Sequence, residues 1–373
     1  MKVLHVSEAC VGGVATYFEE MIPAQVSAMG KENVMLLVRS SFSHNVKNFN
    51  LATLYTYRSE GRDVISLFRM LHTYRLLLYT YHPEIVHLHS TLAGWVIRAY
   101  HALSRRKSPK IVYCAHGWSF HIAGGRAQRC LSVFIERFLA RHCDMIINIS
   151  NFEQDSALDI GIPKEKLKMI YNGISSMQNN QDSIEFRFPN QKYGINLLFI
   201  GRLDPQKGFD ILESAMREVS RKDVKLHVIG ATVMSSSFYN INENCESAIH
   251  FHGWLPREEV LSYINRCNAV VMPSRWEGFG LVAIEAMRSG KAVIASDVGA
   301  LPEIVLDGET GYLFRSGNAD QLRGIIEGLT INKLKKMGDS GRAKFLEKFT
   351  SANFNKCILK CYRELLGLPP ETA

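Results

Sequence analysis

Short, β-rich apolar segments alternate with longer segments of helical periodicity along most of the 373-residue chain. Because consecutive parallel strands need a crossover, which is usually a helix, this alternation predicts βα units wound into parallel sheets. The pattern occurs in two series, separated at residues 175–190 by a polar stretch rich in Ser, Gln and Asn. The sequence therefore predicts an α/β protein with two Rossmann-like domains, at residues 1–172 and 173–345.

The elements expected in each series follow from the same patterns. The first series predicts strands at residues 2–7, 34–39, 85–89, 110–115 and 145–150 and helices at 13–28, 63–81, 91–104 and 126–141. The second predicts strands at 195–200, 224–229, 249–252, 269–272 and 292–295 and helices at 208–219, 258–266 and 280–289. Four further helical segments close the chain, at 320–329, 331–337, 341–348 and 351–366. Ligands bind beyond the carboxyl ends of parallel strands, so we expect the chemistry in these loops, in a cleft between the domains.

The positive charge of the chain is concentrated in its first half. The net charge is +8; residues 1–180 hold 20 Lys and Arg against 13 Asp and Glu, whereas residues 181–373 hold 24 against 23. This asymmetry suits an anionic partner, either a membrane surface or a phosphate-bearing substrate, although ordinary solubilising charge explains it equally well. No nucleic-acid-binding module is recognisable, so nucleic acid is not expected as a partner.

Cysteine usage and the apolar segments predict a cytoplasmic protein. The eight cysteines include no CxxC pair and mostly lie in apolar runs, as reduced core thiols do. Residues 1–6 do not resemble a secretory signal, and the apolar runs are far shorter than the roughly 20 residues of a membrane span. Peripheral binding to the inner face of the cytoplasmic membrane is a further hypothesis.

The loop after the first strand contains Gly12 and Gly13, at the start of a predicted helix. Paired glycines there allow backbone amides to approach an anionic group such as a diphosphate, although such a pair is as often a simple tight turn. The loop does not match GxGxxG, and no suitably placed acidic residue follows it. This argues against a dinucleotide-dependent oxidoreductase.

The loop after the first strand of the second series carries two cations, Arg202 and Lys207, in the sequence Gly-Arg-Leu-Asp-Pro-Gln-Lys-Gly. A leaving nucleoside diphosphate gains negative charge as its bond to a sugar breaks. A fixed Arg and Lys can stabilise that charge where a metal otherwise would. Either residue alone would more simply be an exposed basic turn.

A third segment, residues 273–287, leads from a strand through Gly278, Phe279 and Gly280 into a helix that begins near Leu281. Its free amides can hold phosphate or sugar oxygens. Two carboxylates, Glu277 in the loop and Glu285 within the helix, can accept hydrogen bonds from sugar hydroxyls. Each glutamate alone would more often be solvated.

Together these segments resemble the GT-B glycosyltransferases of family 4, the retaining group 1 glycosyltransferases. The resemblance spans most of the chain. It rests on the two glutamates in a Pro-Ser-x-x-Glu-Gly-Phe-Gly context, on the loop at residues 201–208, and on the turns at 290–296, 299–305 and 308–311. It implies a hexosyltransferase that needs no metal or other cofactor, with an acceptor-binding first domain, a second domain that binds the nucleotide-sugar, and a C-terminal segment, 346–373, that returns to the first.

The resemblance also implies roles for individual residues. Arg202 and Lys207 would bind the donor diphosphate, Glu285 the ribose, and Glu277 with the amides of 278–281 the transferred sugar and its phosphate. Residues implied elsewhere are Gly12 and Gly13 for the diphosphate or acceptor, His116 near the donor sugar, and Trp254 with Leu255 at the base. The acceptor implied is a glycan, expected on a lipid carrier, of a bacterial surface polysaccharide such as O-antigen, capsule or exopolysaccharide.

Three positions depart from the common family pattern: Lys291, where Pro is usual, Ala300, where Gly is frequent, and Ser175, where Asp is typical. They affect turns more than ligands, and leave the sugar open, with UDP-sugars favoured over GDP-sugars. Two rival functions remain. A nucleotide-sugar epimerase could use the same architecture, and an inactive sugar-binding scaffold is the non-enzyme alternative, although it would typically have lost one of the site residues.

Two other features carry weaker hypotheses. His87 and His89 share one strand face, but no carboxylate or thiol accompanies them at ligand spacing, so no metal site is predicted. His121 would lie in the acceptor region or cap a loop.

The segment 126–141 interleaves Arg with aromatic residues at helical spacing and could lie on anionic lipid. Alternatively, Leu131, Phe134, Ile135 and Phe138 would form a stripe packed on the sheet. Arg105, Arg106, Lys107 and Lys110 add a second basic patch.

Overall fold

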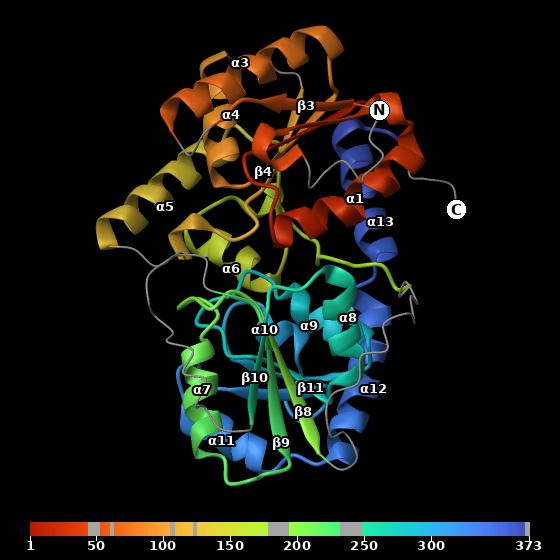
Figure 1. Cartoon of the computed structure of the whole chain (residues 1–373). Helices are drawn as coiled ribbons and strands as arrows, with labels where there is room; N and C mark the ends of the chain where they lie inside the picture. The colour runs from red at the N-terminus through yellow and green to blue at the C-terminus, as the bar shows by residue number, and fades with distance from the viewer. Residues whose placement is uncertain are drawn as a thin grey trace. The chain divides into compact units, whose positions relative to one another are not determined.

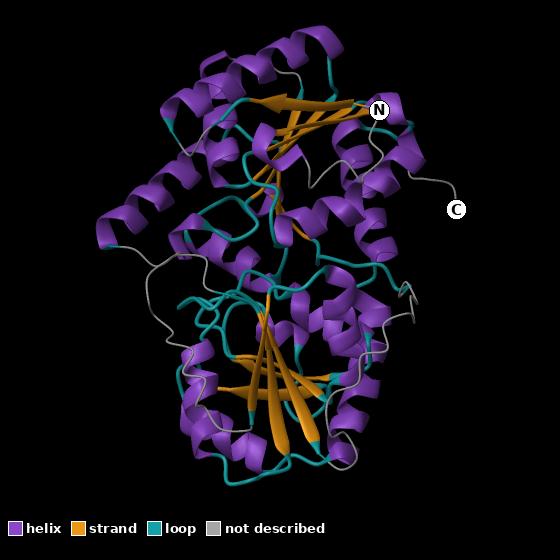
Figure 2. Ribbon diagram, viewed as in Figure 1, coloured by secondary structure: helices purple, strands orange, loops and turns teal. Residues whose placement is uncertain are grey.

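The computed structural model describes residues 1–43, 53–59, 63–104, 109–121, 125–177, 194–231 and 248–369. These residues form two compact units: Met1–Ser175 together with Thr350–Ala373, and Ser176–Phe349. The predicted linker lies outside the described residues beyond Met177, as do Arg105, Arg106 and Lys107. Figure 2 shows that each unit is a sheet flanked by helices.

The first unit contains a seven-stranded parallel sheet in the order β3-β2-β1-β4-β5-β6-β7 (Figure 1). Its strands are β1 Val3–Ser7, β2 Val34–Arg39, β3 Thr53–Tyr57, β4 Ile85–His89, β5 Lys110–Cys114, β6 Met145–Asn148 and β7 Leu167–Met169. Its α-helices are α1 Gly13–Met29, α3 Val64–Tyr81, α4 Thr91–Ser104, α5 Arg126–Ala140, α6 Asn151–Asp159 and α13 Ser351–Leu366.

Side chains of the central strands alternate between the two faces of the sheet, and each face packs against its own layer of helices. On β1, Leu4 and Val6 belong to the core beneath α3, α4 and α5, which includes Met70 of α3 and Ile97 of α4. His5 points to the opposite face, because successive strand residues alternate between faces. There it meets the layer formed by α1 and α13, which contact each other.

The C-terminal helix is joined to the first unit by specific contacts. Thr350 forms a parallel bridge with Ile174, and its hydroxyl caps α13 by accepting from Asn353 N. Further along, the rings of Phe354 and Tyr17 lie 4.9 Å apart in an edge-to-face contact. The sheet of the first unit is thus covered partly by a helix that follows the whole second unit in sequence.

The second unit contains a six-stranded parallel sheet in the order β10-β9-β8-β11-β12-β13. Its strands are β8 Ile195–Ile200, β9 Val224–Ile229, β10 Ile249–Gly253, β11 Ala269–Met272, β12 Ala292–Ser296 and β13 Gly311–Phe314. Its helices are α7 Phe209–Glu218, α8 Arg257–Arg266, α9 Leu281–Arg288, α10 Leu301–Ile304, α11 Ala319–Glu327 and α12 Ile331–Lys348. The strand order reverses between β8 and β11, and between β1 and β4 in the first unit. At such switch points the following loops diverge, which leaves room for a ligand.

The α/β class and the two parallel sheets are confirmed, and the predicted strands and helices are found with nearly the same bounds. The sequence missed β3, β7 and β13, which are edge strands with partly exposed side chains and so a weak apolar signal. It also missed α6, a short and largely polar helix capped by Ser150.

The prediction of two helices at 331–337 and 341–348 was wrong, because they form the single helix α12. Its Gly338 and Gly341 suggested a break. In the structure a Cβ at Gly338 would overlap the carbonyl oxygen of Gly290, so this glycine allows α12 to pack closely on the turn after α9. Close packing, and not chain reversal, explains the small residues.

The sheet-packing alternative for α5 was wrong about which side of the helix is buried, since of the predicted stripe only Ile135 is half-buried. Leu131, Phe134 and Phe138 are 58%, 68% and 47% exposed, while the buried positions of the helix include Glu136 and Leu139. Helix α5 therefore presents its aromatic stripe outward, away from the sheet.

Candidate active site

The loops after β8 and β11 adjoin at the switch point of the second unit. Gly208 has a φ of +64°, and a Cβ on it would overlap the carbonyl oxygen of Pro273. Only glycine combines that backbone conformation with such a close approach. Arg275 N also donates to Gln206 O at 2.8 Å, and the Arg275 guanidinium pairs with both carboxylate oxygens of Asp210. The two loops thus form one connected platform.

An ion pair between Lys207 and Glu277 lies on this platform. Lys207 Nζ donates to Glu277 Oε2 at 2.6 Å, and the hydroxyl of Ser274 donates to the same oxygen at 3.4 Å. The side chains of Lys207 and Glu277 are 22% and 12% exposed, so both are held in place but accessible to a ligand. An ammonium offers three donors and a carboxylate several acceptor positions. The pair can therefore bind an anion and a hydroxyl group side by side.

Arg202 occupies the first part of the same platform. Its Nε lies 2.9 Å from Asp204 Oδ2, and one terminal nitrogen donates to Gln206 Oε1 at 2.7 Å. A guanidinium has five N–H donors in a fixed plane, so these contacts orient it and leave donors for a diphosphate. The Arg202 side chain is 46% exposed, which suits this role.

Helix α9 begins directly after the loop that carries Glu277. Gly280 is its N-cap residue and provides no side-chain cap, so the first amides of the helix have no side-chain acceptor from that position. Phe279 is buried and packs against Phe349, with ring centroids 6.0 Å apart. This contact anchors the loop that carries Glu277. The free amides and the positive end of the helix dipole make this end of α9 an anion-binding position.

Glu285 and Trp254 lie farther from this centre. Glu285 is on α9, and its Oε1 lies 3.8 Å from a guanidinium nitrogen of Arg257 on α8. Trp254 and Leu255 follow β10, the edge strand of the sheet, and the indole of Trp254 is 59% exposed. Trp254 and Leu255 are at the carboxyl edge of the sheet, where an extended ligand would continue from the α9 terminus, and Glu285 lies within α9 beyond that terminus.

In the first unit, Gly12 and Gly13 also stand at a helix N-terminus. Gly12 is the N-cap of α1, with a φ of +55°, and provides no side-chain cap. Both residues are exposed, and nothing lies within 4 Å of a Cβ built on Gly12. The first amides of α1 are therefore open to a small anion or a polar ligand.

His116 follows β5 and has a φ of +53°, which is uncommon for a residue with a side chain. Such conformations cluster at functional sites. Its Nε2 lies 2.9 Å from Nδ1 of His89, and Tyr17 contacts its ring edge-on with centroids 4.5 Å apart. Burial lowers the pKa of His116 to about 3, so the imidazole is neutral at physiological pH.

The hydrogen bonds continue inward from His116. Nε2 of His89 lies 3.1 Å from Nδ1 of His5, and Nε2 of His5 lies 2.8 Å from Oε1 of Gln25. An amide oxygen only accepts, so in this arrangement His5 Nε2 carries the proton, His89 donates to His5, and His116 donates to His89. His116 Nδ1 is then a lone-pair acceptor, and it faces Cys114 Sγ at 3.7 Å.

Sequence reasoning missed His5 and Gln25. The available signal was the strand register, because His5 is the direct partner of His87 on the neighbouring strand, on the same face as His89. Gln25 could not be found this way, since its place depends on how α1 lies on the sheet.

The same histidines are the residues that could hold a metal. One ring nitrogen from each of His5, His87 and His89 lies within 4.8 Å of the others, and all three are buried. His87 Nδ1 lies 2.6 Å from the Tyr362 hydroxyl, and its Nε2 has no hydrogen-bond partner. Burial lowers the pKa of each ring, to about 4 for His5, so the imidazoles are in the neutral form that ligates metals. The hydrogen bond between His5 Nδ1 and His89 Nε2, however, already occupies one ring nitrogen of each of these two histidines.

His121 does not join this group. Its Nε2 lies 2.8 Å from the Ser156 hydroxyl, and its ring packs beside Phe152. These contacts hold the short 3-10 helix Ser119–His121 against α6.

The fold and these loops are typical of one class of enzymes, the GT-B glycosyltransferases, which have two Rossmann-like domains. The family model "Glycosyltransferase Family 4" matches residues 11–176, and "Glycosyl transferases group 1" matches residues 180–344. The chain belongs to the group 1 glycosyltransferases of family 4 and is a glycosyltransferase.

Relatives and solved structures agree with this assignment. An uncharacterized 41.2 kDa protein in the cps region of Klebsiella pneumoniae is 31% identical over 97% of this chain and 99% of its own length. Sucrose-phosphate synthase from Thermosynechococcus elongatus matches with a TM-score of 0.80 and 21% identity, over 98% of this chain and 99% of its own. HepE of Anabaena, in complex with UDP and glucose, matches with a TM-score of 0.78 and 18% identity, over 98% and 100%.

Proposed function

We propose that the protein transfers a hexose or N-acetylhexosamine from a nucleotide-sugar to a glycan acceptor with retention of anomeric configuration. The observation that carries this proposal is the Lys207–Glu277 pair, held at 2.6 Å beside the N-terminus of α9. It places a cation, a hydrogen-bond-accepting carboxylate and free amides together. A sugar bonded to a diphosphate needs this combination.

The donor would lie along the carboxyl edge of the second unit's sheet. Arg202 and Lys207 would bind the diphosphate, and Glu277 would accept hydrogen bonds from the transferred sugar. The amides of residues 278–281 would hold its phosphate, Glu285 the ribose hydroxyls, and Trp254 with Leu255 the base. UDP is the nucleotide we favour, because HepE, which has the same fold, was crystallised with UDP and glucose. GDP-sugars are the alternative donor class.

In the reaction, the bond from the anomeric carbon to the diphosphate oxygen breaks, and the acceptor oxygen bonds to that carbon on the same face. The acceptor's proton passes to the leaving diphosphate oxygen. Arg202 and Lys207 stabilise the charge that develops on the diphosphate, so no metal is required.

The first unit contributes through His116 and through Gly12 and Gly13. A neutral His116 cannot stabilise the departing anion as a cation. Its Nδ1 would instead accept a hydrogen bond from a hydroxyl of the donor sugar, displacing the weak contact with the Cys114 thiol. The amides that follow Gly12 would approach the diphosphate or the acceptor.

The acceptor we propose is a lipid-linked oligosaccharide of a bacterial surface polysaccharide, such as O-antigen, capsule or exopolysaccharide, made at the cytoplasmic side of the membrane. The similarity to a protein in a cps region supports a polysaccharide pathway. The basic excess of residues 1–180 supports an anionic carrier such as a lipid diphosphate.

A panel of UDP- and GDP-sugars tests the proposal directly. We expect release of nucleoside diphosphate from one donor, faster when a lipid-linked glycan acceptor is present, and a product whose anomeric configuration matches that of the donor by NMR. Conversion of the donor to an epimer without acceptor would assign the epimerase function instead. Saturable donor binding with no turnover for any donor–acceptor pair would assign a sugar-binding scaffold.

A further inference from the structure

Three neighbouring helices of the first unit expose many apolar side chains. Helices α3, α4 and α5 cover one face of its sheet, and α4 contacts both α3 and α5 (Figure 1). Of the seventeen large hydrophobic side chains exposed in the described residues, nine are on these helices, with exposures from 46% to 86%. They are Val64, Ile65, Phe68, Leu76, Tyr79, Leu103, Leu131, Phe134 and Phe138. We call the exposed side chains of these three helices the α3–α5 face.

The charge of the α3–α5 face is of one sign. Its exposed ionic side chains are Arg69, Arg75, Arg126, Arg129 and Arg137. The three helices contain a single acidic residue, which is the buried Glu136 of α5. Asp63, the exposed N-cap residue of α3, interacts with Arg69, and no acidic side chain within the three helices is available to neutralise Arg75, Arg126, Arg129 or Arg137.

Glu136 explains why α5 is oriented with its apolar stripe outward. It forms a fully buried ion pair with Arg98 at 2.7 Å and accepts hydrogen bonds from Trp95 Nε1 at 2.7 Å and the Tyr113 hydroxyl at 3.2 Å. The Arg98 guanidinium also lies 3.8 Å from the centre of the Tyr113 ring. Removing one partner of a buried ion pair leaves an uncompensated buried charge and is costly, so the side of α5 that carries Glu136 stays buried.

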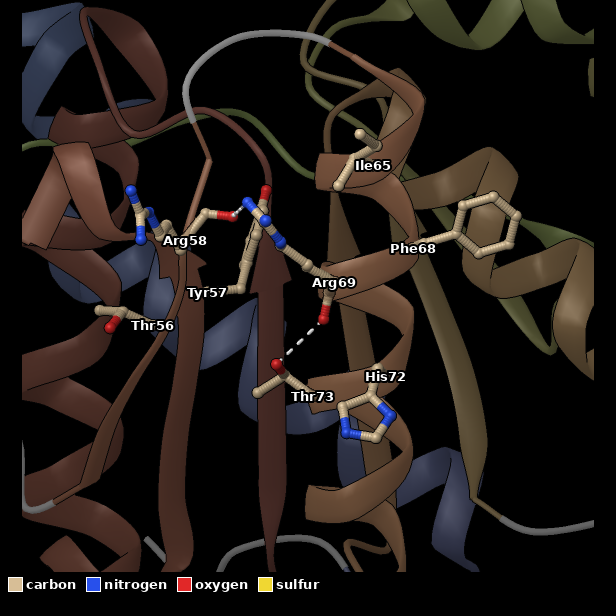
Figure 3. A pocket seen from close by; sticks show the side chains of 8 residues that line it. All are labelled: Thr56, Tyr57, Arg58, Ile65, Phe68, Arg69, His72 and Thr73. Atoms are coloured by element: carbon tan, nitrogen blue, oxygen red, sulfur yellow. Dashed lines mark hydrogen bonds between the residues drawn. The ribbon is translucent and has the colours of Figure 1, made fainter.

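A groove between β3 and α3 adds a cationic recess to the face. It has a volume of about 390 Å³ and is lined by Arg58, Ile65, Phe68, Arg69 and His72 among others. Figure 3 shows the Arg69 side chain reaching over the groove toward Arg58, while Phe68 points away from it. A phosphate in the groove would thus have the Arg69 guanidinium beside it and the exposed side chain of Ile65 next to it.

We infer that the α3–α5 face docks on an anionic lipid bilayer. Exposed aromatic and aliphatic side chains enter the boundary between headgroups and acyl chains, and arginines around them bind lipid phosphates. A second copy of the chain fits poorly, because a twofold contact through this face would oppose arginines with arginines. The inference rests on this surface alone and holds whatever sugar or acceptor the enzyme uses. Within the described residues, no helix is long and apolar enough to cross a membrane, so docking would be peripheral.

Sedimentation with vesicles tests the inference on the full-length protein. We expect binding to phosphatidylcholine vesicles that contain 30% phosphatidylglycerol and little binding to pure phosphatidylcholine. Each of Arg126→Gln, Arg129→Gln and Arg137→Gln should weaken binding about fivefold, and 0.5 M NaCl should weaken it for the wild type. Phe134→Ser should weaken binding at both salt concentrations, since its contribution is apolar.

Matched controls separate docking from folding and from catalysis. Lys356→Gln removes an exposed charge from α13, and Leu368→Ser removes an exposed apolar side chain at the end of the same unit; neither should change sedimentation. Circular dichroism and donor turnover with a soluble acceptor should be unchanged in the Arg and Phe134 variants, because these side chains are exposed on α5. Equal binding of wild type and variants, or equal binding to neutral and anionic vesicles, would overturn the inference. A dimer in solution that Phe134→Ser dissociates would overturn it in favour of self-association, and salt-sensitive capture of an acidic protein without vesicle binding would assign the face to a protein partner.

Discussion

His116 Nε2 lies 2.9 Å from Nδ1 of His89, so the histidine proposed to face the donor sugar is oriented by a second, fully buried histidine and not by a carboxylate. A carboxylate partner would favour the imidazolium form. Burial keeps both rings neutral by lowering the pKa of each, and the hydrogen bond to His89 fixes which nitrogen of His116 carries the proton.

Replacing His89 by Phe should lower kcat about tenfold while KM for the donor changes little. The reason is that His116 would lose the partner that fixes its tautomer, although it would remain in place. His116→Ala should lower kcat further, and in the double variant the two losses should not add, because both act through the same ring. His121→Asn is the control, since its contacts are with Ser156 and Phe152. Additive losses, or full activity of His89→Phe, would show that the two histidines do not act together.

Lys207→Ala and Glu277→Ala should each reduce nucleoside diphosphate release by at least 10²-fold. In the proposed mechanism Lys207 would stabilise the charge that forms on the leaving diphosphate, and Glu277 would bind the transferred sugar. Thermal unfolding should change little, since both side chains are partly exposed at the loop surface. Arg217→Ala breaks an ion pair with Glu213 on the exposed side of α7, and should leave release unchanged. Near-normal turnover in Lys207→Ala or Glu277→Ala would refute the site assignment.

Gly208→Ala should destabilise the second unit and reduce donor affinity together. The new methyl group would overlap Pro273 O and force the two loops of the platform apart, in addition to about 1–2 kcal/mol of strain at positive φ. Gly317→Ala is the matched control, because Gly317 has a φ of +83° but nothing within 4 Å of its Cβ. Calorimetry and donor titration should show a larger loss for Gly208→Ala. Equal losses would mean that backbone strain, and not loop contact, is the important factor.

Stability should fall as the pH is lowered from 7.5 to 5. Burial holds the pKa of His5 at about 4 and of His116 at about 3, below the unfolded value of 6.5, so in this range the unfolded chain binds protons that the folded chain does not. At pH 5.5, each of these two histidines then lowers the free energy of unfolding by about 1.4 kcal/mol, relative to a pH at which it is neutral in both the folded and the unfolded state. The melting temperature should therefore rise with pH up to about 7 and then level off.

Two variants test the source of this pH dependence. His5→Gln should make the melting temperature depend less steeply on pH, because one buried neutral histidine is removed. His116→Gln should have an effect in the same direction. A melting temperature that is constant from pH 5 to 7.5 in the wild type would contradict the buried neutral histidines.

Catalysis should not depend on a metal. We expect EDTA dialysis to leave turnover unchanged, because in the proposed mechanism Arg202 and Lys207 would supply the positive charge for the leaving diphosphate. Elemental analysis of the purified protein should show no stoichiometric zinc, since His5 and His89 are hydrogen-bonded to each other. Stoichiometric zinc that is lost in His87→Phe, with a lower melting temperature, would instead identify His5, His87 and His89 as a structural metal site.

The fold could be predicted from sequence, and the residues proposed to bind the donor could be grouped, because their signals are local. The alternation of β-rich and helical segments specifies parallel βα units, and loops that follow parallel strands necessarily meet at one edge of the sheet. Arg202, Lys207 and Glu277 could thus be grouped although about seventy residues separate the two loops. The edge strands β3, β7 and β13 were missed because pairing on one side and partial exposure leave only a weak apolar pattern.

The sequence by itself determined the two parallel sheets, the family of the enzyme and the loops that carry the residues proposed to bind the donor, since these follow from periodicity and from motifs within single loops. Only the tertiary structure decided which side of a helix is buried and which distant residues touch. Helix α5 has a stripe that periodicity alone assigns to the core, yet the buried Arg98–Glu136 pair comes from two helices and turns that stripe outward. The ring of His116 is likewise set by His89 and His5, which lie on other strands, because strand register and helix packing depend on the whole sheet.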